Sequence, residues 1–184
     1  VSVSGGLAGG DTTVISSAAC APPGQFWISG VNIGFRGAGT RTDLRYSPDG
    51  GATWTDRTPE IGNVSGSTFQ VLPLSFVGAE MGWAIPAPRL VVGGLGIPGT
   101  SPFVLRTTDA GEHWVQQPVP EGFNGALNAL AFADDQRGVA VGAALNSDLS
   151  PTAAAIATDD GGRTWHVASF AAGVGQLLDV TIVP

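Results

Sequence analysis

Three aspartates, Asp49, Asp109 and Asp160, recur at the third position of the pattern Ser/Thr-x-Asp-x-Gly-x-x-Trp, at residues 47–54, 107–114 and 158–165. Carboxylates can act as general acids or bases, and clusters of them can bind calcium. One catalytic centre does not need three equivalent copies, however, and each short segment supplies few carboxylates. The repetition therefore favours a structural role for these aspartates.

The residue types of the pattern suit a tight turn. An aspartate side chain can accept hydrogen bonds from backbone N–H groups of its own turn, and a Ser or Thr hydroxyl can close the same loop. Glycine permits the positive φ that such a turn needs, and the tryptophan can turn back over apolar surface between repeats. The residues expected to build the turns are Ser47, Asp49, Gly51, Trp54, Thr107, Asp109, Gly111, Trp114, Thr158, Asp160, Gly162 and Trp165.

Short alternating segments flank each copy of the pattern and predict the strands that hold the turns. First strands are predicted at 14–20, 70–76, 126–132 and 176–182, and second strands begin at Trp27, Trp83 and Val139. A third strand leads into each turn and a fourth follows it. Four short strands in a unit of about 50 residues are typical of a β-propeller blade. In this alignment Cys20 takes the place of Phe76 and Phe132, which predicts a buried thiol.

The sequence thus predicts an all-β fold, a propeller of four-stranded antiparallel blades. The expected blades cover about 12–64, 65–123 and 124–173, and a further blade begins over 174–184. Residues 1–184 would form one propeller domain or part of one. Propellers normally have about 4–8 blades, because closing the ring removes exposed sheet edges. We therefore expect a longer chain or another chain to complete the ring.

A long insertion between the predicted second and third strands of the second blade is the candidate partner-binding loop. It is rich in Gly and Pro over residues 89–102, and protruding loops often form binding surfaces. Its candidate contact residues are Arg89, Leu90, Val91, Val92, Leu95 and Ile97.

Composition narrows the function classes. Of the residues, 43% are apolar and 12% charged, and 28 Gly and 13 Pro fit a turn-rich β domain. A net charge of −7, with every basic residue an arginine, argues against a nucleic-acid surface. No run approaches the roughly 20 apolar residues of a membrane span. A single cysteine and two separated histidines predict neither a disulfide nor a metal site, and no cofactor is implied.

The repeated pattern resembles the Asp-box, or BNR repeat, of sialidase-type and sortilin-type propellers and of the photosystem II stability and assembly factor family. The last is the most similar, because "GWA" at 82–84 and "GVA" at 138–140 precede the pattern in the order of that family. The resemblance implies a propeller fold and a protein-binding or scaffold role in assembly. It also implies an extracytoplasmic location, in the periplasm, a lumen, at the cell surface or secreted.

An enzymatic function finds little support in the residues. Activity of the sialidase type needs an arginine triad, a tyrosine–glutamate pair and an acidic aspartate, whereas Tyr46 is the single tyrosine and directly precedes a turn. No pair of carboxylates suited to a glycosidase is recognisable. We therefore predict a non-catalytic module that binds a protein or a larger assembly, including other copies of itself. The alternative is part of a carbohydrate-active propeller whose catalytic residues lie outside these 184.

Overall fold

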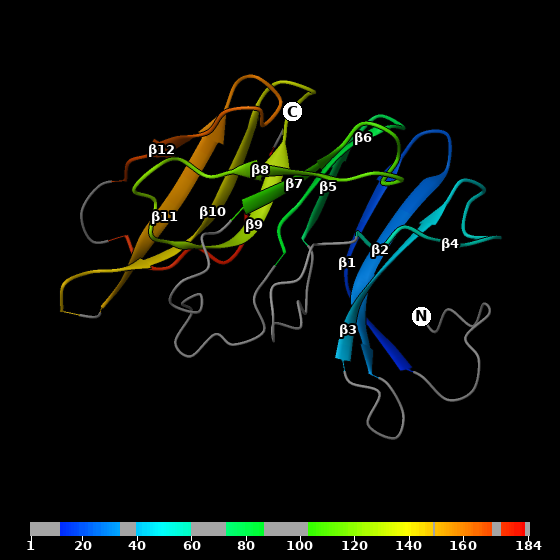
Figure 1. Ribbon diagram of the computed structural model, residues 1–184, viewed down its shortest axis with the longest axis horizontal. Coiled ribbons are helices and arrows are strands. Elements are labelled where there is room, and N and C mark those ends of the chain that lie inside the picture. Colours follow the sequence, from blue (N-terminus) through cyan, green and yellow to red (C-terminus); the bar gives the residue numbers. More distant parts are fainter. Residues whose placement is uncertain are drawn as a thin grey trace.

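The computed structural model describes residues 12–33, 40–59, 73–86, 103–148, 150–170 and 174–182. In these residues, three four-stranded sheets follow one another along the chain, and each strand runs antiparallel to the one before it. Figure 1 shows the sheets side by side, from the first (blue and cyan) through the second (green) to the third (yellow and orange). The predicted all-β fold of four-stranded antiparallel sheets is confirmed.

Each sheet is formed by four consecutive strands. The first sheet contains β1 (Thr12–Ala21), β2 (Gln25–Ile33), β3 (Thr40–Ser47) and β4 (Thr55–Asp56). The second sheet contains β5 (Leu74–Val77), β6 (Met81–Ala84), β7 (Phe103–Thr107) and β8 (Val115–Pro118). The third sheet contains β9 (Ala126–Phe132), β10 (Gly138–Leu145), β11 (Pro151–Thr158) and β12 (His166–Ala168).

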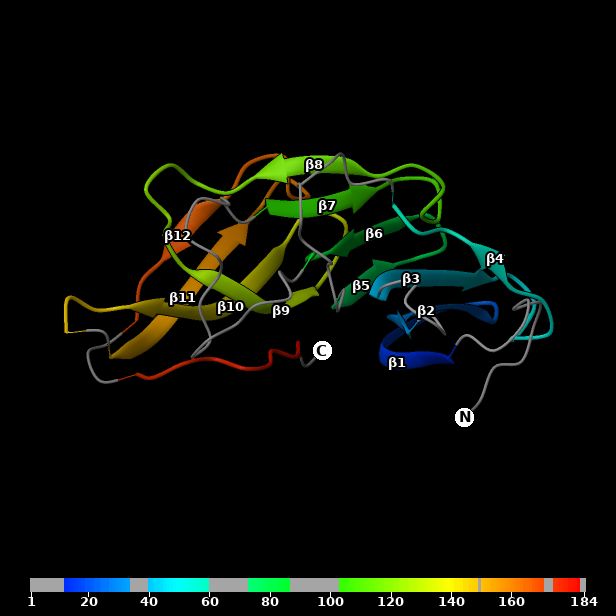
Figure 2. The ribbon, with the colours of Figure 1, turned by 60° about the horizontal axis from the view of Figure 1, so that its bottom comes forward.

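The core lies between the sheets. The first strands form the inner edge, where β5 contacts both β1 and β9, while β4, β8 and β12 lie on the outside (Figure 2). Successive strand residues point to opposite faces, so each interior sheet face can present an apolar set. Trp27, Leu44 and Leu105 are buried between the first and second sheets. Trp83, Phe132 and Ile156 are buried between the second and third sheets.

The prediction of a buried Cys20 is wrong, because the thiol is exposed. Its position in the repeat is nevertheless equivalent to that of Phe76 and Phe132: Cys20 pairs with Phe26 across β1 and β2, as Phe76 pairs with Gly82 and Phe132 with Gly138. Phe76 and Phe132 are covered by the preceding sheet, whereas Cys20 lies on the face of the first sheet that points away from the second.

Residues 174–182 form no strand, contrary to the prediction of a first strand at 176–182. The segment instead lies along the third sheet (red in Figure 2), where the Leu177 N–H donates to the Gly142 carbonyl over 3.0 Å. Leu177 and Val180 pack over the small buried residues Ala129 and Ala155. The segment therefore covers part of the face of the third sheet that points away from the second.

Candidate protein-binding surface

The first repeat turn is closed by the side chains of its own residues. The Ser47 hydroxyl donates to Asp49 Oδ1 over 2.9 Å and accepts from the Gly51 N–H over 2.8 Å. Asp49 Oδ1 also accepts from the Thr53 N–H over 2.8 Å, and Asp49 Oδ2 accepts from the Thr53 hydroxyl over 2.6 Å. Both carboxylate oxygens of Asp49 thus accept hydrogen bonds within the turn.

The other two turns repeat this geometry. Asp109 Oδ1 accepts from the Thr107 hydroxyl and the His113 N–H, and its Oδ2 lies 2.7 Å from His113 Nδ1. Asp160 Oδ1 accepts from the Thr158 hydroxyl and the Thr164 N–H, and its Oδ2 from the Thr164 hydroxyl over 2.7 Å. The hydroxyls of Thr107 and Thr158 accept from the N–H groups of the turn glycines, each over 2.9 Å. All three aspartates are therefore held as hydrogen-bond acceptors.

These hydrogen bonds hold the pKa of the turn carboxyls low. Burial alone would raise the pKa of Asp109, but hydrogen bonds from His113 and Thr107 outweigh it, and the pKa falls from 3.8 to about 2. The N–H and hydroxyl of Thr164 lower the pKa of Asp160 from 3.8 to about 2. A general acid needs a pKa near the working pH. These carboxylates are unsuited to that role at neutral pH.

Acid should destabilise the fold between about pH 4 and pH 2. A carboxyl whose pKa is lowered by folding stabilises the protein above its unfolded pKa of 3.8, and this contribution disappears as the pH falls through about 2. Asp160→Asn should flatten this part of the plot of unfolding midpoint against pH, measured by circular dichroism. Asp159→Asn, at the exposed neighbouring position, is the matched control for the removal of one carboxylate. An unaltered slope in Asp160→Asn would contradict the assignment.

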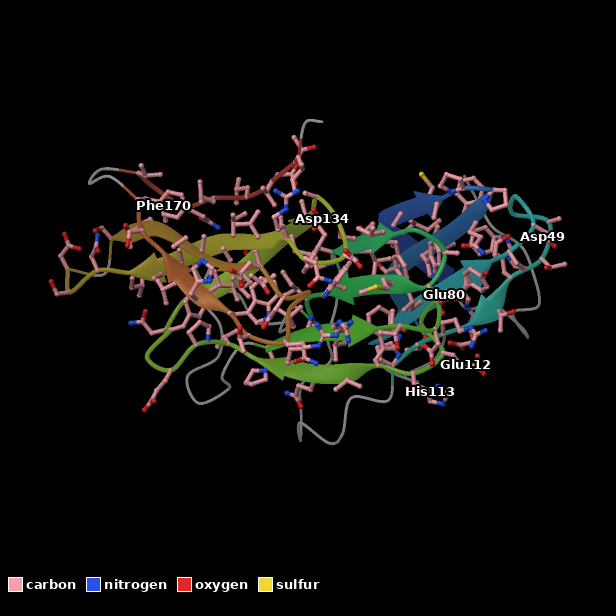
Figure 3. All side chains as sticks on the ribbon, turned by 90° about the horizontal axis from the view of Figure 1, so that it is seen from above. Asp49, Glu80, Glu112, His113, Asp134 and Phe170 are labelled. Atoms are coloured by element: carbon pink, nitrogen blue, oxygen red, sulfur yellow. The ribbon has the colours of Figure 1, made fainter. Side chains whose placement is uncertain are left out.

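Each turn is also tied to the hairpin between the first two strands of its own sheet. The Gly50 N–H donates to the Gly24 carbonyl over 2.9 Å, the Ala110 N–H to Glu80 over 2.9 Å, and the Gly161 N–H to Gln136 over 2.7 Å. Figure 3 shows the turn residues Asp49 and His113 on the outside of the molecule. In each sheet, the turn between the third and fourth strands is thus held against the hairpin between the first and second strands, and the carboxylates remain at the surface.

The turns of the second and third sheets also receive a tryptophan from the preceding sheet. Trp27 Nε1 donates to the Ala110 carbonyl, and Trp83 Nε1 donates to the Gly161 carbonyl, each over 2.9 Å. Trp83 is fully buried. Its ring stacks on Phe132, with 3.5 Å between the ring centroids and 7° between the planes. The turns of the second and third sheets therefore bind the preceding sheet as well as closing their own loops.

The turn tryptophans differ in their environment. Trp165 is buried, whereas Trp54 and Trp114 are half-buried. Trp114 and Trp165 meet the edges of Phe76 and Phe132, at centroid distances of 6.2 Å and 6.0 Å. In the first sheet, Trp54 Nε1 donates to the carbonyl of Gly51 in its own turn over 3.0 Å.

An open cavity of about 520 Å³ lies at the outer edge of the second sheet. Phe103, Pro118, Pro120 and Phe123 contribute apolar walls, and Gln116 and Glu121 contribute polar groups. The candidate loop residues Arg89, Leu90, Val91, Val92, Leu95 and Ile97 lie outside the described residues. The chain returns from that segment at Phe103, so the cavity adjoins the point where the candidate loop re-enters the sheet.

Several other polar contacts of the described residues are ion pairs. Arg57 Nη1 lies 3.2 Å from Glu112 Oε2 and links the first and second sheets. Asp134 accepts from the backbone and side chain of Arg137, which lowers its pKa to about 2. No three His, Cys, Asp or Glu side chains gather as metal ligands within the described ranges. The same ranges contain no helix long and apolar enough to cross a membrane.

Comparisons with known proteins identify the fold. No family model matches the chain. Among solved structures, "YCF48 bound to D1 peptide" has a TM-score of 0.55 and 24% identity over 85% of this chain and 40% of that one. YCF48 from Cyanidioschyzon merolae has a TM-score of 0.52 and 22% identity over 84% of this chain and 39% of the other. The chain has a β-propeller fold.

One curated protein is similar in sequence to part of this chain. The chain is 29% identical over 98 residues to the photosystem II stability/assembly factor HCF136, chloroplastic, of Arabidopsis thaliana. That match covers 53% of this chain and 21% of HCF136. The chain therefore spans about two fifths of the solved propellers and, by this alignment, about one fifth of the curated relative.

Sequence reasoning missed two features of this propeller surface. The first is the contact of Trp27 and Trp83 with the next turn, although their equal positions in the repeat were a signal for it. The second is the cavity, because its walls come from a third strand, a fourth strand and the following connection. No single periodic segment contains that combination.

Proposed function

We propose that this chain is a non-catalytic propeller module that binds another protein, in the manner of an assembly factor. The observation that carries this proposal is the use of both oxygens of all three repeated carboxylates inside their own turns. A glycosidase needs two carboxyl groups that can exchange protons or attack a sugar. The repeated aspartates are committed to structure instead, and we interpret their turns as Asp-boxes of the BNR type.

The binding surface that we propose is the edge cavity, and we also propose a partner-binding role for segment 89–102, which directly precedes Phe103 in the sequence. Phe103 and Phe123 supply aromatic walls, and Gln116 and Glu121 supply hydrogen-bonding groups, a combination that suits a peptide segment. One similar propeller is described as bound to a D1 peptide, and HCF136 is described as an assembly factor. These descriptions support a protein partner for this chain. By the same resemblance, we propose an extracytoplasmic location.

The test is a titration of a fluorescent D1 peptide with the chain, followed by fluorescence anisotropy. Gln116→Arg would place a long charged side chain at the cavity and should weaken binding at least about tenfold, equivalent to about 1.4 kcal/mol. Val167→Arg is the matched control, because Val167 holds the same position after the third turn and is exposed on β12. It should leave the affinity unchanged.

Two results would contradict this function. The first is equal loss of affinity in both arginine variants, or no binding up to about 1 mM peptide, which corresponds to only about 4 kcal/mol of binding free energy. The second is hydrolysis of aryl glycosides or of an aryl sialoside by the purified chain, with loss of that activity in Asp160→Asn. That second result would place catalytic residues within these 184, contrary both to this proposal and to the alternative of a propeller whose catalytic residues lie outside them.

A further inference from the structure

Both interior interfaces of the propeller use the same contact. Trp27 of the first sheet stacks on Phe76 of the second, with 3.8 Å between centroids and 12° between planes, and donates to the Ala110 carbonyl. Trp83 of the second sheet stacks on Phe132 of the third and donates to the Gly161 carbonyl. Each contact therefore needs an indole on one sheet, and a ring and a turn carbonyl on the next.

The first sheet has the same kind of turn that accepts the indole N–H in the second and third sheets. Gly50 stands in its turn where Ala110 and Gly161 stand in theirs, since all three N–H groups donate to the hairpin of their own sheet. Their φ angles are also similar, at 74°, 59° and 75° respectively. The carbonyl of Gly50 is thus the counterpart of the two carbonyls that accept an indole N–H.

The receiving ring is present as well, but on the opposite strand. In the second and third sheets the ring of the first strand lies over a glycine of the second, and a Cβ on Gly82 would come within 2.3 Å of Phe76. In the first sheet the pair is inverted: the small residue is Cys20 on β1 and the ring is Phe26 on β2. Phe26 is 38% exposed and Cys20 is exposed.

We propose that this face of the first sheet receives a further propeller blade that presents a tryptophan at the position of Trp27 and Trp83. The incoming indole stacks on Phe26, covers Cys20 and donates its N–H to the Gly50 carbonyl. This accounts for the exposed Phe26 ring beside the exposed Cys20 thiol, since the equivalent rings of the other two sheets, Phe76 and Phe132, are covered by the tryptophan of the preceding sheet.

The chemistry of the third sheet disfavours a second copy of this chain as the occupant. Its residue at the indole position is Val139, which can neither stack as a ring nor donate. Val139 also packs in a cluster that Leu177 and Val180 partly cover. This chain spans about two fifths of the solved propellers, and the occupant that we infer is a blade of that kind from outside these 184 residues.

The receiving face also sets a condition on the rest of the incoming blade. Arg45 and Asp43 occupy the positions that Leu105 and Phe103 hold in the second sheet, and Arg45 Nε lies 2.7 Å from Asp43 Oδ1. The residues at these positions on the interior faces of the second and third sheets are aliphatic or aromatic. Asp43 is already buried, and Arg45 is paired with both Asp43 and Asp56, so the incoming blade has to cover only the part of the Arg45 side chain that is still exposed.

A chimera that joins residues 1–123 to residues 12–184 supplies the indole from this chain itself. Its junction keeps the register of the repeat, because Thr12 aligns with Asn124, and it places Trp83 ahead of a second copy of the first sheet. Cys20→Ser in the leading copy leaves one thiol to follow with Ellman's reagent. We expect this thiol to react at least about tenfold more slowly than Cys20 of the 184-residue chain, equivalent to about 1.4 kcal/mol of protection.

Matched variants of the chimera separate the indole contact from general crowding. Trp83→Ala in the leading copy, or Phe26→Ser in the second copy, should restore fast reaction, and Trp83→Phe should give an intermediate rate. A thiol as reactive as that of the original chain would overturn the proposal, and so would protection that survives Trp83→Ala.

The unmodified chain gives an independent test of the occupant. Its Cys20 reactivity and native mass should not change between about 1 and about 100 µM, because the third sheet of a second copy has Val139 where an indole would be needed. Protection of Cys20 that grows with concentration, together with a dimeric mass, would identify a second copy as the occupant and overturn the proposal.

Discussion

Trp83→Ala should lower the free energy of unfolding by about 3–5 kcal/mol, the largest effect that we expect from one substitution in this chain. The side chain is fully buried between the second and third sheets, so its removal leaves a cavity. It also ends the stacking on Phe132 and leaves the Gly161 carbonyl without its indole donor. For a domain of this size, the midpoint of thermal unfolding should fall by roughly 6–20 °C.

Trp83→Phe is the matched control for the hydrogen bond. A phenyl ring can still stack on Phe132, but it cannot donate to Gly161, so the cost should be about 1–2 kcal/mol. Urea unfolding followed by circular dichroism measures both variants. A loss under about 1 kcal/mol in Trp83→Ala would show that the contact between the second and third sheets does not depend on this side chain.

Gly162→Ala should destabilise the chain by about 2–3 kcal/mol. Gly162 has φ of +82°, and a Cβ there would lie 3.1 Å from Trp83 Nε1 and 3.3 Å from the Trp165 ring. The substitution therefore combines a left-handed backbone with crowding of two buried rings. The same unfolding measurement checks it, and tryptophan fluorescence should report the displaced rings.

Ala110→Gly provides the control of opposite sign. Ala110 is the non-glycine residue with positive φ among the described residues, at 59°. Glycine relieves that backbone strain but also gains freedom in the unfolded chain, so the net stabilisation should be up to about 1 kcal/mol. If Gly162→Ala and Ala110→Gly shifted stability in the same direction, backbone strain would not explain the glycines of the turns.

The repeat spacing predicted the sheets well, because strand and turn formation depend mainly on local sequence. Alternation over 126–132 and the aspartate and glycine of each turn specify a strand and a loop without knowledge of distant partners. The alternating segment 176–182 shows the limit of this reasoning. A strand also needs a backbone hydrogen-bonding partner, and the sequence pattern of a segment does not state whether one is present.

The environment of a side chain was harder to predict than its place in the repeat. Cys20 was aligned correctly with Phe76 and Phe132, but its burial depends on a sheet that packs against β1. In the first sheet the aromatic ring lies on β2, at Phe26, instead of on β1, and only the register between β1 and β2 reveals this. The cavity required the proximity of β7, β8 and the connection after Pro118. Each of these depends on contacts between segments.

The tryptophan contacts between the sheets are directional, and this limits how such chains can associate. The second sheet donates the Trp83 indole from one face and accepts that of Trp27 on the other, so two copies cannot use this contact through a two-fold axis. Contacts of this head-to-tail kind generate either a closed ring or an open fibre. An indole at residue 139 would give the chain a donor at one end and an acceptor at the other, the requirement for unlimited polymerisation. Val139 supplies no such donor, so we do not expect copies of this chain to join head to tail through the face of the first sheet.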